Sequence, residues 1–129
     1  MPSRWSKYKA VPVEIDGHRF ASRAEGAFYQ HLKTLEAAGV VKAFRLQPRF
    51  ELDAGIKYVG DFEVWLELVP FGHIIDVKGV ETAAFKMKKK LFKAKYGQEI
   101  QVVKAQYRSG KITFNWPPAG LVNTERESS

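Results

Sequence analysis

The first part of the chain changes from apolar residues at strand spacing to apolar residues at helix spacing. Hydrophobic and polar residues alternate over residues 10–20, and Asp16-Gly17 divides this segment with a sequence typical of a two-residue hairpin turn. A helix is predicted to begin at Ser22, because Ser22 and Glu25 have the spacing of a capping box and apolar residues follow at every third or fourth position. The predicted apolar stripe of this helix is Ala24, Phe28, Leu32 and Leu35, and the expected stop is Gly39.

Three strands are predicted in the middle of the chain. Residues 40–52 form the first, and Gln47-Pro48 in its interior indicates an edge position or a bulge, since proline cannot donate a backbone hydrogen bond. Residues 57–68 and 73–79 are predicted to pair as a hairpin that is joined across residues 69–72.

The last third begins with a second helix, predicted over residues 81–96 and ended by Gly97. Strands are expected over residues 100–105 and 111–114 around a Ser109-Gly110 turn, and the tail from residue 115 is expected to fray. The order helix, three strands, helix, strand predicts a mixed α/β fold in which helices pack against a central mixed sheet.

Length and composition favour a single globular domain. The chain has 129 residues, of which 45% are hydrophobic, and no internal repeat. We expect one domain over residues 1–129, with a core at about residues 10–115, a basic lead-in over residues 1–9 and a polar tail over residues 116–129. The absence of cysteine excludes disulfides and thiolate zinc sites.

The charge of the chain favours an anionic partner. Twenty-one Lys and Arg residues against fourteen Asp and Glu residues give a formal net charge of +7, which suits nucleic acid or an anionic membrane surface. The alternative is a basic surface without a partner. No apolar leader or run of about 20 apolar residues is present, so we expect a soluble, cytoplasmic protein that does not enter membranes.

Two neighbouring strands carry the candidate chemistry. Period-two alternation places Tyr58 on the apolar face of the first strand and Asp61 on its polar face, while Asp76 and Lys78 share the polar face of the second. A loop over residues 67–70 would bring Asp61 directly opposite Asp76. A loop two residues later would separate the two carboxylates by two rungs, and the sequence alone leaves both registers open.

Opposed carboxylates indicate a cation between them. Like charges on opposite rungs repel, and Mg²⁺ bound through one or two carboxylates, water and phosphate oxygens would compensate that repulsion. Lys78 would then lie where it could orient or deprotonate a water for attack on a phosphodiester. The plainer interpretation is an ion pair between Asp76 and Lys78. Glu25 is explained as a helix cap, although its helix could also direct it at the same cluster.

Taken together these residues resemble the signature of the PD-(D/E)XK nuclease superfamily. That signature is an acidic residue on the first core helix, an Asp on the second core strand and an Asp or Glu followed at two residues by Lys on the third. The matching positions are Glu25, Asp61, Asp76 and Lys78. The resemblance implies a restriction-endonuclease-like αβββαβ core over residues 21–105. Gly60 stands where the name of the superfamily has proline, and Asp76 where Glu is more frequent.

More closely, the chain is similar to small phage-encoded proteins of this superfamily that are related to Holliday junction resolvases. The shared segments are the Gln-Pro strand (residues 46–50), Tyr58 to Phe62, and Asp76 to Thr82. The resemblance implies that Asp61, Asp76, the Val77 carbonyl and Glu25 bind Mg²⁺, or Mn²⁺ in its place, and that Lys78 is catalytic. Gln47 is expected near the site.

The implied activity is endonucleolytic cleavage of branched DNA during phage recombination or replication in a bacterial host. A homodimer is expected, because resolving a junction requires two symmetric cuts. The alternatives are a nuclease of the same fold that nicks duplexes or ends, and a nucleic-acid-binding module that does not cut.

Lysines dominate the second predicted helix. Six of them fall between positions 86 and 95, and the expected DNA-binding residues are Lys86, Lys88, Lys89, Lys90 and Lys93. Lysines contact phosphates rather than base edges, so this helix predicts affinity without sequence choice. The alternative is a solvated helix face. The expected buried stripe of the helix is Phe85, Leu91, Phe92 and Tyr96, and Arg4, Lys7 and Lys9 offer a second basic contact.

Overall fold

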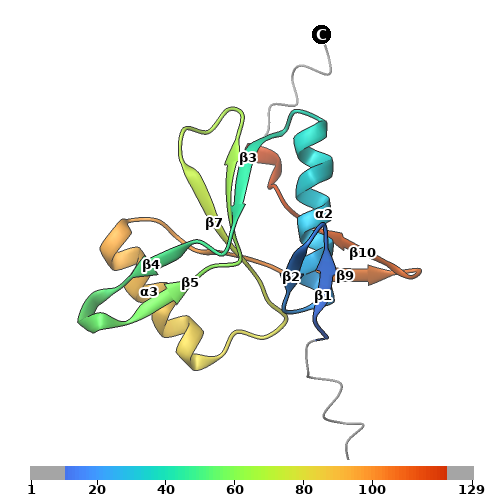
Figure 1. The fold of residues 1–129 in the computed structure, drawn as a ribbon. Helices are drawn as coiled ribbons and strands as arrows, with labels where there is room; N and C mark the ends of the chain where they lie inside the picture. The colour runs from blue at the N-terminus through green and yellow to red at the C-terminus, as the bar shows by residue number, and fades with distance from the viewer. Residues whose placement is uncertain (1–10, 122–129) are drawn as a thin grey trace, which may run out of the picture.

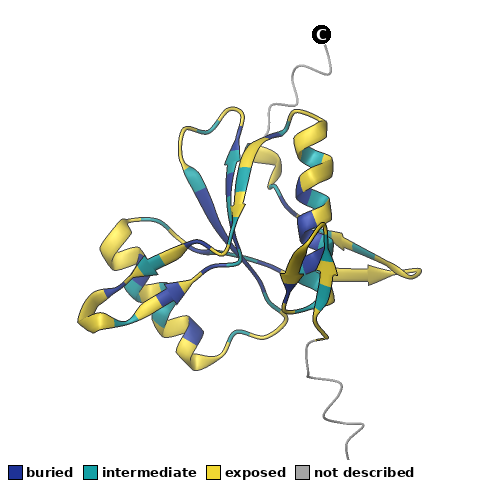
Figure 2. Cartoon of the chain, viewed as in Figure 1, coloured by how far each residue is buried: buried dark blue, intermediate teal, exposed yellow. Residues whose placement is uncertain are grey.

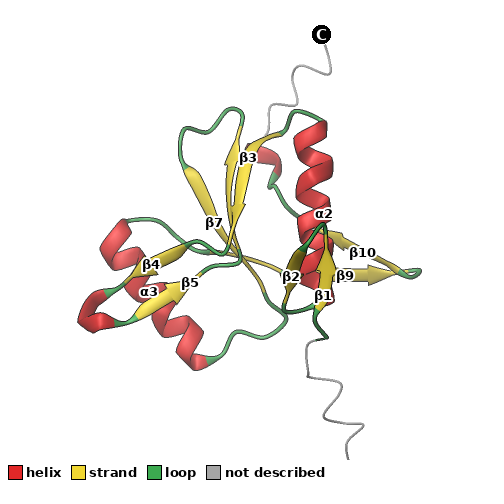
Figure 3. Ribbon diagram, in the orientation of Figure 1, coloured by secondary structure: helices red, strands yellow, loops and turns green. Residues whose placement is uncertain are grey.

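A four-stranded sheet lies between two helices in the computed structural model, which describes residues 11–121 (Figures 1 and 3). The strands in spatial order are β3 (Val41–Leu46), β6 (Phe62–Leu66), β7 (Gly72–Val77) and β8 (Gln101–Val103). β8 runs parallel to β7, whereas the other pairs are antiparallel. The prediction of a mixed α/β fold with a mixed sheet and flanking helices is confirmed at this level.

Strand β7 is buried on both faces, and Figure 2 shows it as one of the darkest segments of the chain. Ile75 and Val77 belong to a core cluster with the first helix, α2 (Arg23–Ala37), and Ile74 belongs to a second cluster with the other helix, α3 (Ala83–Tyr96). Alternate residues of one strand therefore contact opposite layers.

The N-terminal elements form as predicted. β1 (Val13–Ile15) and β2 (His18–Phe20) pair through a turn in which Asp16 and Gly17 both have positive φ. Ser22 caps α2 by accepting a hydrogen bond from the Glu25 backbone N–H at 3.1 Å. Phe28 and Leu32 of the predicted stripe are fully buried.

The predicted strand over residues 40–52 is divided in two by Gln47 and Pro48. β3 pairs with β6, whereas β4 (Arg49–Glu51) pairs with β5 (Lys57–Val59) in a separate ribbon closed by the 3-10 turn η1 (Asp53–Gly55). The physical reason is local: Pro48 lacks a backbone donor and Gln47 adopts a φ of 52°, so the strand cannot continue straight.

The predicted strand over residues 57–68 is broken at the matching point. The Gln47 N–H donates to the Asp61 carbonyl and the Gly60 N–H donates to the Pro48 carbonyl, each at 2.9 Å. These two bonds join the two broken strands at the point where both change direction. Beyond it, the β4–β5 ribbon leaves the sheet and lies beside α3 (Figure 1). The prediction that Tyr58 faces the same core as Phe62 is wrong for this reason, since Tyr58 lies in the cluster on the α3 side.

Helix α3 begins at an N-cap, Thr82, and ends at Gly97 in the left-handed conformation. Phe85 and Phe92 are buried as predicted, whereas Tyr96 remains 44% exposed. Tyr96 packs on Phe92 at the rim of the β4–β5 ribbon, where its hydroxyl donates to the Glu51 carbonyl at 2.8 Å.

The C-terminal segment forms a hairpin and then returns to the core. β9 (Ala105–Arg108) pairs with β10 (Lys111–Phe114) around Ser109-Gly110, and a 3-10 turn, η2 (Ala119–Leu121), follows. The expectation that the tail frays from residue 115 is wrong over residues 115–121, because Trp116 is 5% exposed and packs edge-on against Phe28. The basic lead-in with Arg4, Lys7 and Lys9, and residues 122–129, lie outside the described residues. Across residues 11–121, no helix has the length and apolarity needed to cross a membrane.

Candidate active site

Asp61 directly precedes β6, and Asp76 lies near the end of β7, where β7 is still paired with β8. The last rung of the ladder pairs Phe62 with Ile75, so the same register carried one residue further sets Asp61 against Asp76, and the Asp61 N–H donates to the Ile75 carbonyl at 3.1 Å. This is the closer of the two registers that the sequence left open. Both side chains therefore project from the same face of the sheet.

The Asp61 carboxylate is held across the strand pair. Its Oδ2 accepts a hydrogen bond from the Val77 N–H at 2.8 Å. This bond fixes the side chain, and the carboxyl group also contacts the side chain of Asp76.

Asp76 is the more deeply buried of the two, with 2% of its surface exposed. Its Oδ2 accepts a hydrogen bond from the Tyr58 hydroxyl, and its Oδ1 lies 3.9 Å from Nζ of Lys78. A buried carboxylate normally requires such partners. The sequence missed Tyr58 as a site residue, because uninterrupted alternation assigned it to the other face of the sheet.

Lys78 reaches the site from the strand end that β8 supports. Its backbone N–H donates to the Val103 carbonyl at 3.0 Å, and its Nζ lies 4.5 Å from the centre of the Phe85 ring. The ammonium group is therefore held between a carboxylate and an aromatic face, near the start of α3.

Glu25 approaches from α2 and lines one cleft together with Asp61 and Gln47. The backbone of Ala21 acts to lower the pKa of this carboxyl group, against the larger effect of burial. Arg19 lines the same cleft from β2. The structure thus brings Glu25 and Gln47 to the acidic pair, as the sequence predicted.

The carboxylates repel one another electrostatically. Burial raises the pKa of Asp61 to about 8, and the nearby charges of Asp76 and Glu25 add to this shift. Burial is also the largest cause of the raised pKa of Glu25, to which Asp76 contributes, while Lys78 acts in the opposite direction. The pKa of Tyr58 is raised by burial and by Asp76, so its hydroxyl remains a donor. The carboxyl groups of Glu25, Asp61 and Asp76 and the ammonium group of Lys78 are therefore close enough to interact electrostatically.

The donor set fits a hard divalent cation. Within residues 11–121, no three His, Cys, Asp or Glu side chains form a preformed metal cage. Mg²⁺ does not require one, because it is commonly held by one or two carboxylates with water and substrate phosphate completing its shell. Asp61 and Asp76 supply two anchored carboxylates, and a cation between them would relieve the repulsion described above.

Gly60 is buried immediately before this site. A Cβ placed on it would lie 3.2 Å from the Tyr58 hydroxyl and 3.3 Å from the Ile74 side chain. The missing side chain therefore leaves room for the hydroxyl that Asp76 uses.

The lysines of α3 divide between two flanks of the helix. Lys86, Lys89, Lys90 and Lys93 line one hollow together with Glu81 and Glu99. Two of these lysines are paired, Lys89 with Glu81 at 3.8 Å and Lys93 with Glu99 at 2.8 Å.

Lys88 does not line that hollow. It lies two turns before Lys95, whose Nζ donates to the Glu51 carbonyl on β4, and the two lysines therefore share the flank that faces the β4–β5 ribbon. The five predicted DNA-binding lysines do not form a single patch.

Comparison with known proteins gives a family for this chain. No curated protein and no solved structure matches the chain. A family model described as "Protein of unknown function (DUF1064)" matches residues 5–113. That match includes Glu25, Asp61, Asp76 and Lys78 and covers most of the 129 residues. The chain therefore belongs to the DUF1064 family.

Proposed function

We propose that this protein is a Mg²⁺-dependent DNA endonuclease with a site of the PD-(D/E)XK type, built on the restriction-endonuclease-like core of that superfamily. The observation that carries the proposal is the placement of Asp61 beside Asp76 at the end of the β6–β7 ladder, where the charge of Asp76 helps to raise the pKa of Asp61, with Lys78 Nζ 3.9 Å from the Asp76 carboxylate. Glu25 lines the same cleft as Asp61. The proposal is hydrolysis of phosphodiester bonds, with Mn²⁺ able to replace Mg²⁺.

In this proposal some residues bind the metal ion and others orient the attacking water. Asp61, Asp76 and the Val77 carbonyl would hold the metal ion, and Glu25 would hold it directly or through water. When bound, Mg²⁺ would supply positive charge at the scissile phosphate and make attack by water easier at neutral pH. Lys78 would orient the attacking water beside Asp76, while Tyr58 would keep the Asp76 carboxylate in place.

Branched DNA is the substrate that we propose, in particular a four-way junction of phage recombination or replication. The net charge of +7 and the lysines of α3 suit a polyanion with closely spaced phosphates. One site per chain and two symmetric cuts per junction imply a homodimer on the substrate.

The deciding experiment compares a four-way junction with a linear duplex of the same sequence. Wild-type protein should cut the junction in Mg²⁺ and leave it intact in EDTA. Asp76→Asn should bind the junction with unchanged affinity and not cut it. The matched control is Asp53→Asn, which removes an exposed carboxylate at the tip of the β4–β5 ribbon and should cut normally.

Two results would contradict the proposal in different ways. Binding without any cutting in Mg²⁺ or Mn²⁺ would identify a non-cleaving nucleic-acid-binding module. Faster cutting of the linear duplex than of the junction would identify a duplex-nicking or end-nicking nuclease of the same fold.

A further inference from the structure

The β9–β10 hairpin has one face that consists of polar and basic side chains. The ladder pairs Arg108 with Lys111 and Gln106 with Thr113, so these four residues lie on the same face, and all four are exposed. From Lys104 to Leu121 the sequence contains no Asp or Glu. No carboxylate of the hairpin itself therefore neutralises its cations.

Arg108 and Lys111 are directly opposed across the last rung before the turn. Like charges at this position destabilise a strand pair. The pair is kept at a tight Ser109-Gly110 turn in which both residues have positive φ, so a change of register cannot separate the two positions. An anion bound between them would remove that repulsion.

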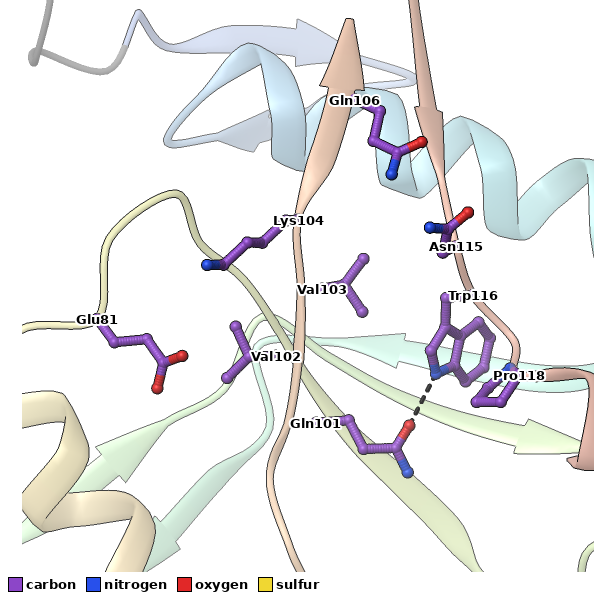
Figure 4. Close-up of a pocket in the computed structure, with 9 residues that line it drawn as sticks. All are labelled: Glu81, Gln101, Val102, Val103, Lys104, Gln106, Asn115, Trp116 and Pro118. Carbon is purple, nitrogen blue, oxygen red and sulfur yellow. Dashed lines mark hydrogen bonds between the residues drawn. The ribbon is translucent and has the colours of Figure 1, made fainter.

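The same polar face continues into a hollow at the base of the hairpin. Lys104, Gln106 and Asn115 line it together with Gln101 and Trp116, as Figure 4 shows. Glu81 also lines the hollow, where it is paired with Lys89. Gln and Asn side chains present a donor and an acceptor side by side, which is the pattern that reads base edges in a DNA groove.

The hairpin is anchored to the rest of the protein and does not rely on a partner to take its shape. Phe114 packs edge-on against Phe28 of α2 with ring centres 5.0 Å apart. The Trp116 indole N–H donates to the Gln101 side chain at 2.7 Å, and its carbonyl contacts the His31 ring at 2.7 Å. A preorganised surface loses little freedom when it binds.

We infer that the polar face of the β9–β10 hairpin lies in a groove of duplex DNA, with Arg108 and Lys111 on phosphates and Gln106 and Asn115 at base edges. The major groove is wide enough for a two-stranded ribbon of this kind. The choice of DNA as the anion rests on the proposed function, and the hairpin would add sequence preference to a protein whose α3 lysines have none. A face of amides, a hydroxyl and cations suits this partner better than an apolar partner surface.

The hairpin is also tied to the candidate active site. The Lys78 N–H bonds to the Val103 carbonyl, and β9 begins two residues after Val103. Arg108 is five residues beyond Val103, which corresponds to about 17 Å of extended strand. The contact would therefore lie within about five base pairs of the scissile phosphate.

The test measures binding of a short fluorescein-labelled duplex in EDTA, where hydrolysis does not contribute. Arg108→Ala and Lys111→Ala should each lower affinity about tenfold and reduce the salt slope by about 0.9. Lys42→Ala removes an exposed cation from the sheet edge, beside the β6–β7 turn, and should change neither value. Gln106→Ala should leave the salt slope unchanged and flatten the sequence preference selected from random duplexes.

Lys111→Glu separates loss of binding from loss of folding. It replaces a repelling pair with an ion pair to Arg108, so its Tm should equal or exceed that of wild type while its affinity for DNA falls. Unchanged affinity in Arg108→Ala and Lys111→Glu would overturn the inference, even if the wild-type protein cuts junctions. Tighter binding of single-stranded RNA than of duplex DNA would also overturn it. Loss of binding in these variants would support it even if no cutting is found, so the two proposals fail separately.

Discussion

The Tyr58 hydroxyl donates a hydrogen bond to Oδ2 of Asp76, from a strand that does not belong to the same sheet. The bond crosses from the β4–β5 ribbon to the end of β7. It orients the carboxylate so that the other oxygen, Oδ1, is the one nearest to Lys78. The ribbon therefore acts as a support for the candidate active site.

Tyr58→Phe should weaken cleavage without unfolding the protein. The ring remains buried in the α3-side cluster, while the lost hydroxyl leaves Asp76 free to rotate, so we expect about a 10- to 100-fold lower rate or metal affinity. Tyr96→Phe is the matched control, because it removes a tyrosine hydroxyl that bonds to the Glu51 carbonyl away from the site. Junction cleavage assays over a range of Mg²⁺ concentrations measure the rate and the apparent metal affinity of both variants. Equal rates in the two variants would count against the supporting role of Tyr58.

The stability of the metal-free protein should fall as pH rises from about 4 to about 8. Burial and neighbouring carboxylates raise the pKa of Asp61 from 3.8 to about 8, so the folded state holds a proton that the unfolded state releases within this range. The folded form is therefore favoured at the acid end of this range and loses that advantage toward pH 8. Thermal unfolding in EDTA measures this trend, and Asp61→Asn should flatten it.

Mg²⁺ should reverse this loss. Metal binding requires the ionised carboxylate, so the rise in Tm on adding Mg²⁺ should be larger at pH 8 than at pH 6 and absent in Asp61→Asn. Asp53→Asn, at the ribbon tip, should behave as wild type. A Mg²⁺-induced rise in Asp61→Asn equal to that of the wild type would show that the ion binds elsewhere.

Gln47 can be tested for backbone strain and side-chain function separately. Its φ of 52° favours glycine, so Gln47→Gly should be about 1 kcal/mol more stable than Gln47→Ala in denaturant unfolding. Gln47 lines the cleft with Glu25 and Asp61, and both variants lack its amide, so both should cut about tenfold more slowly than wild type. Wild-type cleavage by either variant would restrict Gln47 to a structural role.

The lysines of α3 should differ in their contribution to DNA binding. Lys86→Ala combined with Lys90→Ala should lower affinity and reduce the salt slope by about two, since each lysine in contact with phosphate releases about one counterion. Lys93 is paired with Glu99 at 2.8 Å, so Lys93→Ala should change the slope little. Lys88→Ala tests the other flank of the helix. If Lys88→Ala has the larger effect, the DNA lies along the β4–β5 side of α3.

The local elements of this fold could be predicted from the sequence because their signals are short-range. Asp16-Gly17, Ser22 with Glu25, and Gly97 each determine a turn or a helix end through their own backbone preferences. The acidic pair could also be placed on one face, since the alternation from Asp61 to Leu66 is unbroken.

The breaks and the long-range contacts could not be predicted in the same way. The alternation of polar and apolar residues gives no sign that the strand changes direction at Gly60 and Asp61. It therefore predicts the wrong cluster for Tyr58. The burial of Trp116 depends on Phe28, which is far away in the sequence, and no local pattern indicates it. The division of the lysines between two flanks likewise depends on where β4 and Glu99 lie.

Because Gly60 is packed closely against Tyr58, the residues at positions 58 and 60 should vary together in evolution. A methyl group there would approach the Tyr58 oxygen to 3.2 Å, so relatives with alanine or proline at position 60 should have a smaller or hydroxyl-free residue at position 58. Such relatives would need another donor for the aspartate on β7. Glycine here is thus the partner of a tyrosine, and the two should be gained and lost together.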